Sequence, residues 1–95
     1  MAITTPSGFS SVAKGIFPVT IDIASIPAVE TLVVTATVPC STGDIGILVP
    51  PADLDMGLLW TTGWCADAGT MSFRFGNVTA GAINEASGTF YIMVI

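Results

Sequence analysis

Short runs in which apolar and polar residues alternate, each ended by proline, glycine or another turn residue, constrain the fold of this chain most strongly. Val19, Ile21 and Ile23 alternate with polar or small residues, and residues 71–77 repeat the pattern with larger side chains. A period of two places successive side chains on opposite faces of a β-strand. No long segment has the 3.6-residue period of an amphipathic helix. The sequence therefore predicts an all-β fold.

Turn sequences divide the chain into about six or seven short strands, at the spacing of about 8–12 residues that is typical of a β-sandwich or barrel. Residues 50–57, "PPADLDMG", are expected to form a loop, with room for one helical turn over residues 52–56, because two prolines remove two backbone donors. We predict a compact antiparallel β-sandwich or barrel-like domain over residues 16–95. An extended N-terminal arm, residues 1–15, precedes it and is rich in small and polar residues.

The last strand and one glycine carry more specific expectations. The final residues, 89–95, read "TFYIMVI" and are apolar on both faces. Such a strand is expected at the centre of a sheet or at a seam between subunits. Gly63 lies between Trp60 and Trp64, and a glycine inside a strand indicates a bulge or a point where another backbone comes close.

The chain carries few charges: two Lys and Arg residues, seven Asp and Glu residues, and a net charge of -5. Charged residues make up 9% of it, compared with about 25% in typical soluble domains. An isolated monomer would therefore expose an unusually apolar surface. No apolar run approaches the ~20 residues of a membrane-spanning helix, and the scarcity of basic residues disfavours nucleic acid and anionic lipid. We expect copies of this chain and other proteins to cover the surface.

The sequence offers no catalytic group. Histidine is absent, and Lys14 is the only lysine, so the usual general bases and nucleophile–base pairs are missing. Asp53 and Asp55 form the one close pair of carboxylates. After two prolines they are expected to bond local backbone N–H groups, with a weak Ca²⁺ site as the alternative. The sequence thus predicts no enzyme, no metal and no cofactor.

Three residues remain open to two readings. Cys40 and Cys65 follow no metal-binding spacing and are expected to be either two reduced, partly buried thiols or a disulfide. Asn77 begins "NVT", a glycosylation sequon. The start of the chain lacks a charged leader followed by an apolar stretch. We therefore expect a cytosolic product in which the sequon has no meaning.

Candidate interface residues lie in the arm, on the aromatic strands and on the last strand. The tryptophans are expected either in the core or as interface anchors, because tryptophan is enriched in binding hot spots. Arg74 alternates with two phenylalanines and is expected to pair with a carboxylate across strands or across a subunit boundary. The candidates are Ile3, Phe9, Val12, Phe17, Trp60, Trp64, Arg74, Tyr91, Met93 and Ile95.

Three segments together resemble a small β-domain of tailed-bacteriophage virion proteins, including those of cyanobacterial phages. They are "VTIDIASIPAVETLVVTATVP", "GDIGILVPPADLDMGLLW" and "FRFGNVTAGAINEASGTFYIMVI", and the resemblance covers residues 17–95. Its most specific part is the ending, in which two turns, "NVTAG" and "SGT", precede the final strand. The resemblance implies a sandwich or barrel-like protomer grouped about a three-fold axis.

The expected function is that of a structural virion protein. The leading hypothesis is a capsid cement or decoration protein, a homotrimer that bridges major capsid subunits on the capsid surface after synthesis in the host cytoplasm. Its arm would reach onto neighbouring surfaces. The alternative is a receptor- or glycan-binding knob of a tail fibre, which would use Trp60 or Trp64 and the loop near Asp53.

Overall fold

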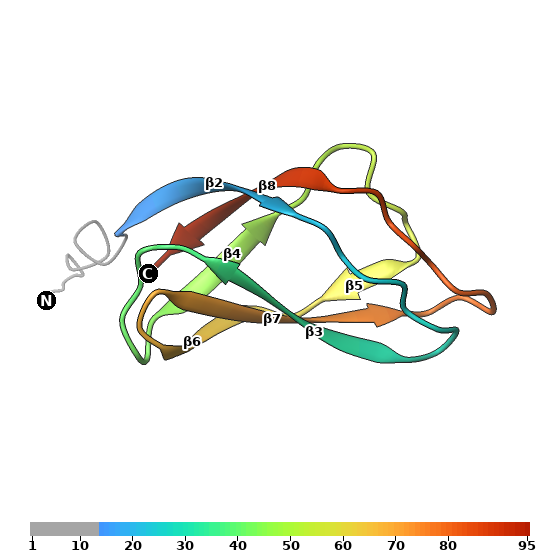
Figure 1. Ribbon diagram of the computed structural model, residues 1–95, viewed down its shortest axis with the longest axis horizontal. Helices are drawn as coiled ribbons and strands as arrows, with labels where there is room; N and C mark the ends of the chain where they lie inside the picture. The colour runs from blue at the N-terminus through green and yellow to red at the C-terminus, as the bar shows by residue number, and fades with distance from the viewer. Residues whose placement is uncertain (1–13) are drawn as a thin grey trace, which may run out of the picture.

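The computed structural model describes residues 14–95. Seven antiparallel strands form one sheet in the order β2-β8-β4-β6-β7-β3, and β5 pairs with β7 (Figure 1). Residues 14–95 contain no helix. The strands are β2 (Gly15–Ile21), β3 (Thr31–Thr37), β4 (Ile45–Val49), β5 (Leu58–Trp60), β6 (Gly63–Asp67), β7 (Thr70–Asn77) and β8 (Gly88–Val94).

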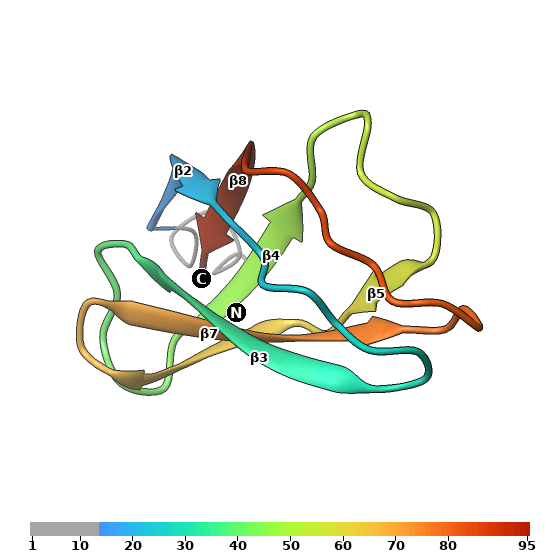
Figure 2. The same ribbon diagram turned by 45° about the vertical axis from the view of Figure 1, so that its right-hand side comes forward.

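The sheet curls into a half-barrel. Figure 2 shows β2 and β8 lying over β7 and β3, with β4 rising from the lower strands toward the upper ones. Strands β2 and β3 are the two edges of the sheet. This arrangement confirms the predicted fold class, an all-β, antiparallel, barrel-like domain of about seven short strands.

Large apolar side chains fill the inside of the curl. Phe73, Phe75 and Phe90 are at most 1% exposed, and the rings of Phe75 and Phe90 meet edge to face with centroids 6.3 Å apart. The predicted alternation is confirmed on β7, where Met71 is buried with Phe73 and Phe75 while Arg74 faces out. Burial of several aromatic rings is the main source of stability in a domain this small.

Gly63 marks a close approach, and its cause is a side chain rather than a backbone. A Cβ at this position would lie 2.4 Å from Cε1 of Phe73, so only glycine leaves room for that ring. A register shift between Trp64 and Asp67 interrupts the pairing of β6 with β7. The expected bulge is therefore present, but it lies between Trp64 and Asp67 and not at Gly63 itself.

Strand β8 lies between β2 and β4, which confirms the prediction of a central strand. Ile95 extends its pairing, because its N–H and C=O both bond to the backbone of Ile45 at 2.8 Å. Lys14 and Gly15, which the sequence analysis assigned to the arm, already pair with Val94. The rest of the predicted arm, residues 1–13, lies outside the described residues.

Residues 50–57 connect β4 to β5 as a loop, as predicted. The helical turn expected over residues 52–56 is wrong: the segment contains two separate turns, at residues 52–53 and 56–57. Backbone bonds from Leu54 to Pro51 and from Leu58 to Asp55 close these turns. Each turn ends after one hydrogen bond, so no helix is nucleated.

Candidate functional site

The most unusual feature of the described protein is a continuous apolar face on the outside of the half-barrel. Cross-strand pairing aligns its side chains in rows: Ile16 pairs with Met93, which pairs with Ile47. A second row runs through Pro18, Tyr91 and Val49, and a third through Ile95, Ile45 and Trp64. We call these nine residues of β2, β8, β4 and β6 the outer apolar face.

The outer apolar face is open to solvent in the isolated protomer. The side chains of Ile45, Ile47, Val49 and Tyr91 are 44–54% exposed, and Ile16 is 61% exposed. None of the nine residues is charged. Scattered exposed apolar residues are common on soluble proteins, but a contiguous apolar patch rimmed by polar groups is typical of an interaction site.

The orientation of β4 explains why this face is apolar. Gly46 and Leu48 point into the core, and a Cβ on Gly46 would lie 2.9 Å from Cγ and Sδ of Met71. Glycine at 46 is thus needed for the inward face, and the period of two sends Ile45, Ile47 and Val49 outward. A slip of one residue would push isoleucines into a space that Met71 already fills.

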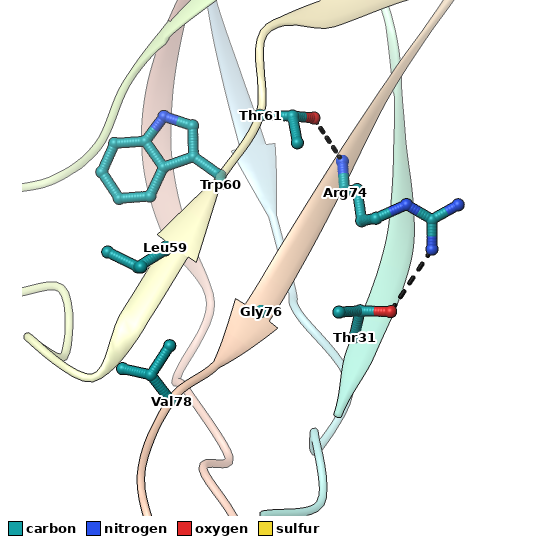
Figure 3. Close-up of a pocket in the computed structure, with 7 residues that line it drawn as sticks. All are labelled: Thr31, Leu59, Trp60, Thr61, Arg74, Gly76 and Val78. Carbon is teal, nitrogen blue, oxygen red and sulfur yellow. Dashed lines mark hydrogen bonds between the residues drawn. The ribbon is translucent and has the colours of Figure 1, made fainter. Parts of the chain in front are cut away.

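A groove lies on the same outer surface at the far end of β7 (Figure 3). It measures about 220 Å³, and it exists because Gly76 has no side chain between its partners Thr31 on β3 and Leu59 on β5. Figure 3 shows Leu59 and Val78 on one side and Arg74 with Thr31 on the other. The groove is lined by Thr31, Leu59, Trp60, Thr61, Arg74, Gly76 and Val78.

Arg74 supplies the positive charge of this groove. Its Nη1 donates a hydrogen bond of 3.3 Å to Oγ1 of Thr31, and the only ion pair among residues 14–95 joins Lys14 to Asp44. The expected pairing of Arg74 with a carboxylate across strands is therefore corrected to a weak bond with a hydroxyl. The alternative, a carboxylate from another subunit, stays a prediction.

The two tryptophans play different parts. Trp64 is 40% exposed on the outer apolar face. Trp60 packs against Phe75 with ring centroids 6.1 Å apart and is half-buried at the mouth of the groove. It also lines a larger hollow of about 520 Å³ with Asp55 and the loop after β4. One tryptophan therefore belongs to the surface, and the other links core and surface.

The remaining candidates divide by position. Tyr91, Met93 and Ile95 lie on the outer apolar face, although Met93 and Ile95 are only partly exposed. Phe17 faces inward and packs against the core, so it contributes nothing to that face. The candidates of the arm, Ile3, Phe9 and Val12, lie outside the described residues.

One ion pair fixes the start of β2 to the end of the β3–β4 connection. Nζ of Lys14 lies 2.6 Å from Oδ1 of Asp44, and the backbone N–H of Ser41 donates to Oδ2 of Asp44 at 2.9 Å. The hydrogen bond from Lys14, reinforced by that from Ser41, lowers the pKa of Asp44 below its ordinary value of 3.8. The contact anchors the chain beside the outer apolar face.

Asp55 acts as the local cap that the sequence predicted. Its Oδ1 accepts a 2.7 Å hydrogen bond from the N–H of Gly57, and its own N–H donates to Oε1 of Glu85 at 3.1 Å. Among residues 14–95, no three potential metal ligands gather in one place.

Asn77 is a structural residue that the sequence analysis set aside. Its side chain is 2% exposed, and Nδ2 donates to the carbonyls of Ile26, Pro27 and Gly81 at 2.8–3.3 Å. Its Oδ1 accepts hydrogen bonds from the N–H and the hydroxyl of Thr79. The sequence signal for this role is the "NVTAG" turn, because an asparagine side chain in a turn often bonds nearby backbone groups.

Comparison of the chain with protein-family models, with curated proteins and with solved structures gives no match. Within residues 14–95 there is no helix with the length and apolar character needed to cross a membrane.

Proposed function

We propose that this protein is a structural assembly protein whose outer apolar face is covered by neighbouring copies of the same chain. The proposal rests on nine uncharged and mostly apolar side chains that are aligned across four adjacent strands. The most exposed of these side chains are 40–61% open to solvent. Removing such a surface from water is favourable, by about 25 cal/mol of free energy for each Å² of apolar area that a partner covers.

Several properties of the face suit contact with another protein. Most of its side chains are β-branched or aromatic and are held on paired strands, so little conformational freedom is lost when a partner covers them. Aromatic residues and methionine are enriched in the centres of protein interfaces, where charged residues are depleted. Trp64, Tyr91 and Met93 match that composition.

Copies of this chain suit the face better than a basic partner does, because the face offers no charge to attract one. Closed cyclic assemblies, including trimers, are common among soluble homo-oligomers. The resemblance to phage virion proteins implies grouping about a three-fold axis, and on that ground we propose a homotrimer. Size-exclusion chromatography with light scattering on the full chain tests this: a mass of three chains supports the proposal, and a mass of 9.7 kDa at all concentrations refutes it.

The resemblance to phage virion proteins supports a more specific proposal. The trimer would act as a capsid cement protein on the capsid surface and would bridge major capsid subunits. Many shallow apolar contacts acting together would hold the capsid subunits by multivalency. The low charge and the absence of histidine from the sequence agree with this role.

The copy number of this chain in purified virions tests the capsid proposal. A number comparable with that of the major capsid protein supports head decoration. A number far below it supports a tail component, and the absence of the chain from virions refutes both.

One observation favours a second candidate, a receptor- or glycan-binding tail-fibre domain. The hollow of about 520 Å³ combines the ring of Trp60 with the carboxylate of Asp55, and aromatic faces with nearby acceptors suit sugar rings. Titration with a panel of glycans, followed by tryptophan fluorescence, tests it. A saturable change that is lost in Trp60→Leu and kept in Trp64→Leu supports glycan binding at this hollow.

A further inference from the structure

Two thiols from distant parts of the chain meet at one end of the half-barrel. Sγ of Cys40, in the β3–β4 connection, lies 2.6 Å from Sγ of Cys65 on β6. A disulfide bond is about 2.05 Å long, so the two sulfur atoms are separated by little more than a bond. No disulfide joins Cys40 and Cys65 in this structure.

The backbone around the two thiols is already fixed. The N–H of Gly43 donates to the carbonyl of Cys65 at 2.9 Å, and the N–H of Cys65 donates to the carbonyl of Asp44 at 3.0 Å. On the other side, the N–H of Gly69 donates to the carbonyl of Cys40 at 2.9 Å. These bonds hold the connection against β6 from both directions, so the thiols face each other without help from a covalent link.

The two thiols differ in access to solvent. Cys65 is 3% exposed, and its burial, together with the hydrogen bond to Cys40, raises the pKa of its thiol. Cys40 is half-exposed. An oxidant from solvent therefore meets Cys40 first, and Cys65 is placed behind it as the resolving thiol.

We propose that Cys40 and Cys65 form an intramolecular disulfide when the protein meets a low-molecular-weight disulfide such as oxidised glutathione. The thiolate of Cys40 attacks one sulfur of the oxidant, which breaks the S–S bond of the oxidant and releases one thiol. Cys65 then loses its proton and attacks Sγ of the mixed disulfide, which releases the second thiol. Two protein thiols are oxidised and one disulfide is reduced to two thiols, so electrons and protons balance.

The cross-link would stabilise the domain without moving its strands. It closes a loop between residues 25 positions apart that contains β4, the strand at the middle of the outer apolar face. Loop closure restricts the unfolded chain, and for a domain of this size the expected gain is an increase in Tm of about 10–20 °C. The inference does not depend on the proposed assembly, because both thiols lie within one protomer.

The test uses the full chain, reduced, freed of reductant and then incubated with oxidised glutathione. The expected product has lost two hydrogen atoms by intact mass spectrometry, migrates as a single chain without reductant, and has no thiol that reacts after denaturation. Its Tm exceeds that of the reduced protein and returns to the starting value when a dithiol is added.

Cys40→Ser is the matched control, because the half-exposed site tolerates a hydroxyl. This variant is expected to show no increase in Tm on oxidation. Wild-type protein that keeps two reactive thiols, gains a stable glutathione adduct, or forms only disulfide-linked dimers refutes the proposal. The mass measurement on the wild type decides it even if the variant does not fold.

Discussion

A charge at the centre of the outer apolar face provides the sharpest test of the proposed assembly. Ile47 lies in the middle row of that face, where it pairs with Met93 on β8 and sits just beyond the first residue of β6, and it is 44% exposed. In the sheet it points away from the core, so Ile47→Glu adds a carboxylate at the surface and removes no core contact. The isolated domain should therefore lose less than about 1 kcal/mol of its free energy of unfolding.

The effect on association should be much larger. Complete burial of an isoleucine side chain is worth about 1.5–3 kcal/mol, so covering the exposed 44% of Ile47 contributes about 1 kcal/mol. Burying an unpaired carboxylate in the interface costs a further ~3–5 kcal/mol. Together these terms lower the association constant by about 10³- to 10⁴-fold, since 1.4 kcal/mol corresponds to a factor of ten. Ile47→Ala, which loses only the apolar term, should lower it about fivefold.

Sedimentation velocity over a range of concentrations measures the association constants of Ile47→Glu and Ile47→Ala. Circular dichroism verifies that each variant is folded. Thr35→Glu is the matched control, because Thr35 is an exposed, outward-facing residue of the same sheet on edge strand β3. The control should associate like the wild type. A folded Ile47→Glu protein that associates as tightly as the wild type would refute the assignment of this face.

Three further predictions concern the fold. Asn77→Ala should lower the free energy of unfolding by about 2–4 kcal/mol, measured by urea denaturation, because it leaves several buried carbonyl and N–H groups without partners. Gly63→Ala should cost about 1–3 kcal/mol in the same assay through its clash with Phe73, whereas Gly43→Ala, with no atom within 4 Å of its Cβ, should cost only the strain of its positive φ. The lowered pKa of Asp44 means that its ion pair stabilises the fold above pH 3.8 and that this contribution is lost as the pH falls below that value. The difference in Tm between the wild type and Asp44→Asn should accordingly be constant near neutral pH and shrink in acid; a difference that grows in acid would contradict the assignment.

The fold was predictable where the two faces of a strand differ. On β7, phenylalanine and methionine alternate with Ser72 and Arg74, and the structure places them as the pattern predicts. On β4, both faces are apolar, so the alternation of Ile45 and Ile47 with Leu48 does not reveal which residues are buried. The decision comes from Met71 on another strand, which leaves room only for a glycine at 46. Contacts of this kind are invisible to a local pattern.

The candidate site was predictable in kind but not in detail. Low charge indicated an exposed apolar surface, and the last strand supplied Tyr91 and Met93. In one regular strand, Trp60 and Trp64 would face the same side, because they are four residues apart. The break between β5 and β6 places Trp64 on the surface and Trp60 at the border of the core, and the sequence pattern does not show this break. The partner of Arg74, a hydroxyl on β3, depended on which residues of β3 and β7 lie opposite each other, and the pattern within a single strand does not show that.

Oxidation of the methionines by dilute peroxide tests the central claim most directly, because the chain carries its own reference residues. Met56 is 95% exposed on a loop and Met71 is fully buried, while Met93 lies partly exposed on the outer apolar face. If neighbouring copies cover that face, oxidation of Met93 should slow to the rate of Met71 as the protein concentration rises, and Met56 should stay fast throughout. A rate at Met93 that remains well above that of Met71 at every concentration would contradict the account.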